Sequence, residues 1–64
     1  MIIRTKVETS KGAMRTAYYK HMMSNGKATL GSKSDAAVFD AATGATVLKH
    51  LQQIDHRFAQ AELV

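Results

Sequence analysis

One stretch of this chain, from Ala41 to Ile54, repeats its apolar residues at the spacing of a helix, which limits the folds available to it. The residues of the apolar stripe are Gly44, Val47, Leu48, Leu51 and Ile54. Asp40 precedes the stretch, and its carboxylate can accept hydrogen bonds from the free amides of a first helical turn. Asp55 and His56 end it. The sequence therefore predicts one amphipathic helix, whose apolar stripe needs a second apolar surface to cover it.

Other segments alternate with the period of two that is typical of half-buried strands. In Ile2–Glu8, one side carries Ile3, Thr5 and Val7 and the other carries Arg4, Lys6 and Glu8, with Ile2 as the one apolar exception on the charged side. Ala36–Phe39 is short and apolar, and we predict an inner strand there. Phe58–Val64 alternates weakly. It predicts a strand that returns to pair with the first one, with a helix continued through Ala61 as the alternative.

The segment Ala13–Met23 fits two structures. As a helix it would place Met14, Tyr18 and Met22 together, with Ser10 as N-cap and Gly26 just after the last turn. As a strand it would place Arg15, Ala17, Tyr19 and His21 on one face. Asn25-Gly26 can supply the two positive φ angles of a type I′ turn, and 27–30 would then be the returning strand. We favour the hairpin.

These elements predict an α+β fold, in which a small antiparallel sheet of three to five strands carries one helix of the C-terminal half packed on one face. We expect one domain spanning residues 1–64, close to the lower size limit for independent folding. The chain has no cysteine, so disulfides cannot stabilise it. A small fold with an open sheet edge has a physical reason to form a homodimer.

The net charge of +4 is distributed unevenly. Residues 1–33 carry seven Lys and Arg against Glu8 alone, whereas residues 34–64 carry two against four acidic residues. Such asymmetry indicates contact with an anionic partner, either nucleic acid or an acidic protein surface. The alternative is that lysines on exposed strands only keep the chain soluble and prevent edge pairing.

Basic and aromatic residues alternate within this basic half, as they do in proteins that bind single strands by base stacking and backbone contacts. The candidate nucleic-acid-binding residues are Arg4, Lys6, Arg15, Tyr19, Lys20 and Lys27. Tyr19 is the candidate stacking ring. No sequence signature of a known nucleic-acid-binding module accompanies them.

The sequence favours a non-enzymatic function. Its serines stand in no nucleophile elbow, its glycines form no phosphate-binding loop, and no cofactor is expected. His50 and His56 are six residues apart, which does not match the spacing of a helical metal pair, and His21 is remote in sequence. We therefore expect neither a catalytic nor a metal site.

A second function stays open beside nucleic-acid binding. In size and composition the chain resembles small proteins encoded by phages and other mobile elements, many of which bind host machinery. It would then be an adaptor or inhibitor of a host protein or nucleoprotein complex. The start of the chain has no signal-peptide core and no apolar run is long enough to span a membrane, so a cytoplasmic location without membrane contact is expected.

Overall fold

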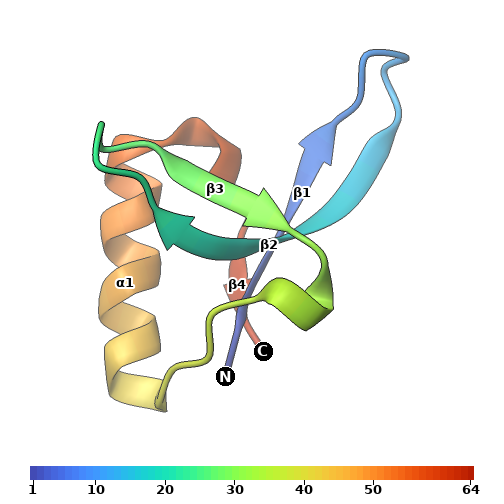
Figure 1. Cartoon of the computed structure of the whole chain (residues 1–64). Helices are drawn as coiled ribbons and strands as arrows, with labels where there is room; N and C mark the ends of the chain where they lie inside the picture. The colour runs from blue at the N-terminus through green and yellow to red at the C-terminus, as the bar shows by residue number, and fades with distance from the viewer.

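The computed structural model describes all 64 residues and has the expected α+β architecture, a four-stranded antiparallel sheet with one helix packed on one face (Figure 1). The strand order is β3-β2-β1-β4. The elements are β1 (Ile3–Glu8), β2 (Met14–Met22), β3 (Ala28–Gly31), α1 (Ala41–Ile54) and β4 (Glu62–Leu63), with short 3-10 helices η1 (Lys33–Asp35) and η2 (His56–Phe58). The 14-residue α1 is the longest helix, and no helix is long and apolar enough to cross a membrane.

The strand interpretation of the segment Ala13–Met23 is confirmed, and the helical alternative is wrong. β2 pairs with β1 in a register that places Thr5 opposite Ala17, and with β3 in a register that places Tyr19 opposite Leu30. Thr5 and Ala17 are both buried beneath the helical layer, as the alternation in the sequence predicts.

β2 contains an irregularity that the sequence did not reveal. Tyr19 pairs with Leu30 and His21 with Thr29, so Lys20 is an extra residue without a partner, as in a β-bulge. The extra residue reverses the alternation that follows it. His21 therefore lies on the exposed side of the sheet rather than on the face of Ala17 and Tyr19, where a regular strand would place it.

The turn at Asn25-Gly26 forms, but the predicted type I′ geometry is wrong. Gly26 has a positive φ of 83°, but the φ of Asn25 is not positive. The Met23 amide donates to Lys27 O (2.7 Å) and the Gly26 amide to Met23 O (2.9 Å). The loop is thus three residues long, with glycine in the left-handed position at its end. The β1–β2 loop repeats this design with Gly12 at a φ of 78°.

Gly26→Val is expected to destabilise the protein by about 1–3 kcal/mol, the usual cost of holding a residue with a Cβ in an unfavourable backbone conformation. A Cβ at this position would meet no atom within 4 Å, so the backbone alone sets the cost. Gly26→Asn is the matched control, because asparagine tolerates positive φ, and it should melt closer to the parent. Equal melting temperatures for the valine and asparagine variants would contradict the left-handed conformation.

α1 begins as predicted. The Thr43 amide donates to Asp40 Oδ1 (2.7 Å), and this bond holds the pKa of the Asp40 carboxyl below its usual value. Leu51 and Gly44 are buried on the predicted stripe, and Gly44 allows close approach of Leu63 from β4. Ile54, however, is 49% exposed and does not belong to the core as the stripe predicted.

Of the two remaining predicted strands, the one in the tail forms in part and the one at Ala36–Phe39 does not form. Glu62–Leu63 pairs with Arg4 and Ile3, so the predicted return of the tail to the first strand is confirmed there, whereas Phe58 belongs to η2 and not to the strand. Ala36–Phe39 is not a strand. It connects η1 to α1 and makes single backbone bonds to different parts of the chain, from Ala37 to Tyr19 O and from Phe39 to Met1 O. A segment with such scattered partners builds no ladder.

The core lies between the sheet and α1, and aromatic rings form its centre. Its buried residues are Ile3, Tyr19, Ala28, Leu51 and Phe58. The Tyr19 ring stacks beside Phe39, with centroids 6.2 Å apart, and meets Phe58 edge to face at 6.1 Å. The buried cluster thus joins five elements of the chain, β1, β2, β3, α1 and η2.

Candidate nucleic-acid interface

The structure separates the six predicted binding residues. Arg4, Lys6 and Lys20 lie on what we call the outer face, the side of the sheet turned away from α1. Arg15 pairs with Val7 and so points to the opposite side, near the end of the hairpin. Lys27 follows the β2–β3 turn.

Tyr19 is not part of the interface. It is only 8% exposed and packs against Phe39 and Phe58, so its ring is not accessible for stacking on a base. This burial raises the pKa of its hydroxyl. The cross-strand register decides its direction, because Ala17 faces inward opposite Thr5 and Tyr19 is two residues further along.

Tyr18 takes the place on the outer face that the sequence interpretation assigned to Tyr19. It is half-buried and lies between Arg4 on β1 and Gly31 on β3. Two adjacent tyrosines on a strand must point to opposite faces, so the sequence showed that one would be exposed without showing which.

The outer-face cations differ in how free they are. The Arg4 guanidinium makes a close ion pair with Glu62, and this hydrogen-bonded partner raises the pKa of Arg4. Lys20 passes close to Gly31, where a Cβ would lie 3.6 Å from its Cδ. Neither Lys20 nor Lys6 forms an ion pair.

The β1–β2 hairpin continues beyond the rest of the sheet as a two-stranded arm. β4 pairs with β1 only at Ile3 and Arg4, and β3 pairs with β2 only from Tyr18 onward. Residues Lys6–Thr16, which we call the ribbon, therefore pair only with each other. All are exposed except the half-buried Val7 and Thr9, and Figure 1 shows the ribbon standing clear of α1.

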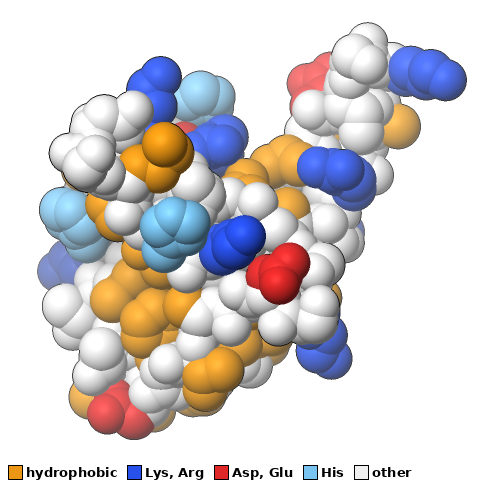
Figure 2. All heavy atoms as spheres, in the orientation of Figure 1, with side chains coloured by type: hydrophobic (Ala, Val, Ile, Leu, Met, Phe, Trp, Pro, Cys, Tyr) orange, Lys and Arg blue, Asp and Glu red, His pale blue; other side chains and the backbone are white.

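The ribbon carries a concentrated positive charge. Its three cations, Lys6, Lys11 and Arg15, oppose a single acid, Glu8, so these 11 residues hold a net +2, half of the charge of the whole chain. None of the three cations forms an ion pair. Figure 2 shows Lys and Arg side chains along this projecting part of the molecule. Lys11, at the tip, was not among the predicted site residues, although the surrounding residues Thr9-Ser10-Lys11-Gly12 are typical of a turn and could have indicated an exposed cation.

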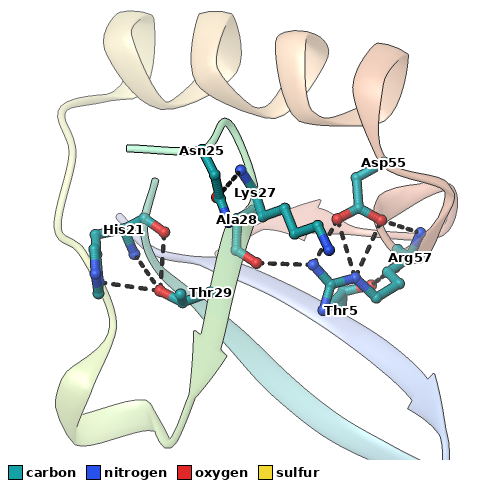
Figure 3. A network of polar contacts seen from close by, with 8 residues as sticks. All are labelled: Thr5, His21, Asn25, Lys27, Ala28, Thr29, Asp55 and Arg57. Atoms are coloured by element: carbon teal, nitrogen blue, oxygen red, sulfur yellow. Dashed lines mark hydrogen bonds and ion pairs between the residues drawn. The ribbon is translucent and has the colours of Figure 1, made fainter. Parts of the chain in front are cut away.

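A polar network at the root of the ribbon holds the hairpin on the body of the protein (Figure 3). The Thr5 hydroxyl donates to Arg57 O (2.7 Å), and Arg57 Nη2 donates to Ala28 O on β3 (2.8 Å). Asp55 accepts from both Nε and Nη2 of Arg57. The bond with Arg57 lowers the pKa of Asp55 and raises that of Arg57. Arg57 therefore links η2 to two strands, and its Nε and Nη2 donors are used within the fold.

The three histidines do not come together in one cluster. His21 Nδ1 lies 3.0 Å from Thr29 Oγ1, and this hydroxyl also donates to the His21 carbonyl (Figure 3). No three His, Asp or Glu side chains come close enough together to hold a metal ion. The candidate interface therefore consists of exposed cations without ion-pair partners, and not of a metal-binding cluster.

Comparisons of the chain with protein-family models, with curated proteins and with solved structures found no match.

Proposed function

We propose that the chain is a non-enzymatic binding module that docks nucleic acid through its basic N-terminal half. The observation that supports this most is the set of unpaired cations on the ribbon and the adjoining outer face. Phosphate contacts by Lys and Arg supply most of the affinity of such proteins, and they require cations that are free of internal partners.

The salt dependence of binding provides the first test. Binding of a fluorescent 20-mer is expected to weaken steeply with salt, with a log–log slope of about −0.9 for each phosphate neutralised on duplex DNA. Arg15→Glu combined with Lys20→Glu should abolish binding at 150 mM salt. The melting temperature should hardly change, because exposed substitutions usually alter stability by less than about 0.5 kcal/mol.

The control for this test is Lys33→Glu with Lys49→Glu, which changes the net charge equally but lies outside the ribbon and the outer face. Both lysines are exposed, on η1 and α1. This control should retain most of the binding. If the parent protein binds no oligonucleotide even at low salt, nucleic acid is not the partner.

An adaptor or inhibitor that binds a host protein is the second candidate function. Figure 2 shows hydrophobic side chains gathered at the surface between α1 and the segment that follows β3. The half-buried apolar residues of these two segments that pack against the core are Ala37, Phe39, Val47 and Leu48. A partner captured from lysate equally well with and without nuclease would favour this function, since an apolar interface depends little on nucleic acid or salt.

A further inference from the structure

Cations project from the ribbon in three different directions. Lys6 pairs with Thr16 on the outer face, whereas Arg15 pairs with Val7 and points from the opposite face. Lys11 lies in the loop at the tip, between the two strands. A partner with a flat surface could be contacted by cations on only one face of the ribbon. Cations on both faces and at the end are suited to a groove with two charged walls and a floor.

We infer that the ribbon enters the major groove of B-form DNA, with Lys6 and Arg15 contacting the phosphates of opposite walls and Lys11 reaching the base edges. This inference rests on the proposed function and adds the nucleic-acid form and the docking element. Lysine donors at the groove floor are suited to the O6 and N7 acceptors of guanine.

The dimensions of the ribbon agree with this groove. A two-stranded ribbon with its side chains is about 10 Å thick, and the major groove of B-DNA is about 12 Å wide and about 8.5 Å deep. Three residues of each strand, from 6 to 8 and from 14 to 16, extend about 10 Å at about 3.4 Å per residue. The tip can therefore reach the floor. The major groove of A-form RNA is too narrow for side chains to read.

The test compares a DNA duplex with an RNA duplex of the same sequence by fluorescence anisotropy at 50 mM salt. The DNA duplex should bind on the order of tenfold more tightly, because only its groove admits the ribbon. Lys6→Glu with Arg15→Glu should weaken DNA binding by at least about tenfold and reduce the salt slope by about 2. Lys6→Gln with Arg15→Gln should give a smaller loss in the same direction, and thermal melting checks that each variant folds.

The matched control is Lys20→Glu with Lys27→Glu, an equal change in charge within the basic half but outside the ribbon. It should weaken binding less than the ribbon pair. If it weakens binding as much, or if RNA binds as tightly as DNA, the ribbon is not the docking element, although the proposed function stands. A parent protein that binds neither duplex nor single strands contradicts the proposed function itself.

Dimethyl sulfate modification of a short bound duplex identifies the groove. Guanine N7 lies in the major groove and adenine N3 in the minor groove. The parent should protect N7 and leave N3 reactive, and Lys11→Ala should lose part of the N7 protection. Protection of N3 alone would place the ribbon in the minor groove and overturn the inference.

Discussion

Phe58→Ala is expected to lower the free energy of unfolding by about 3–5 kcal/mol, as truncation of a buried aromatic ring does. The Phe58 side chain is fully buried in η2 and meets the Tyr19 ring edge to face. A folded chain of 64 residues has a stability of about 3–10 kcal/mol at the usual value per residue. The substitution should therefore remove between about a third and all of the stability, and the variant should melt far below the parent.

Urea denaturation followed by circular dichroism measures this loss, as a lower midpoint for Phe58→Ala. The control is Val38→Ala, because Val38 is 79% exposed, and its removal should change stability by less than about 0.5 kcal/mol. A midpoint for Phe58→Ala equal to that of the parent would show that η2 does not pack against the sheet.

Leu51→Ala is expected to cost about 2–5 kcal/mol, since it removes a fully buried side chain and leaves a cavity between α1 and the sheet. Ile54→Ala is the matched control on the same helix. Both residues belong to the predicted apolar stripe, but Ile54 is 49% exposed. Its truncation should therefore cost much less than that of Leu51.

Thermal unfolding of the two variants tests whether Leu51 alone is in the core, as in the structure, or whether Ile54 is in the core too, as the sequence stripe predicted. If Leu51 alone is in the core, its variant melts far below the parent and Ile54→Ala melts near it. Equal losses of stability would mean that α1 is rotated or extended relative to its present packing. An unchanged melting temperature for Leu51→Ala would remove Leu51 from the core.

Several elements were predictable because interactions between near neighbours decide them. The N-cap bond from Thr43 to Asp40 spans three residues, and the helical stripe depends only on periodicity. The two hairpin loops follow from glycines that adopt positive φ. The uneven distribution of charge can be counted directly in the sequence, and it identified the basic half.

The errors concern contacts between distant segments. The segment Ala36–Phe39 has the composition of a strand, but its amides donate to the carbonyls of Tyr19 and Met1. These two residues lie on different segments, so no strand ladder forms. The choice of Tyr19 as the exposed ring failed for the same reason. Which of two adjacent tyrosines faces inward depends on the register with β1 and on the helix that covers that face.

The sequence by itself determined the α+β class, the helix from Ala41 to Ile54 and the basic character of the first half, and it favoured the hairpin at Asn25-Gly26, because periodicity, capping and turn chemistry act locally. Only the tertiary structure decided where strand pairing stops. β4 covers just two residues of β1, so Lys6–Thr16 is left as a free ribbon with cations on both faces. Such an outcome depends on how far one distant strand extends along another, and this length is set by packing across the whole fold rather than by any single segment.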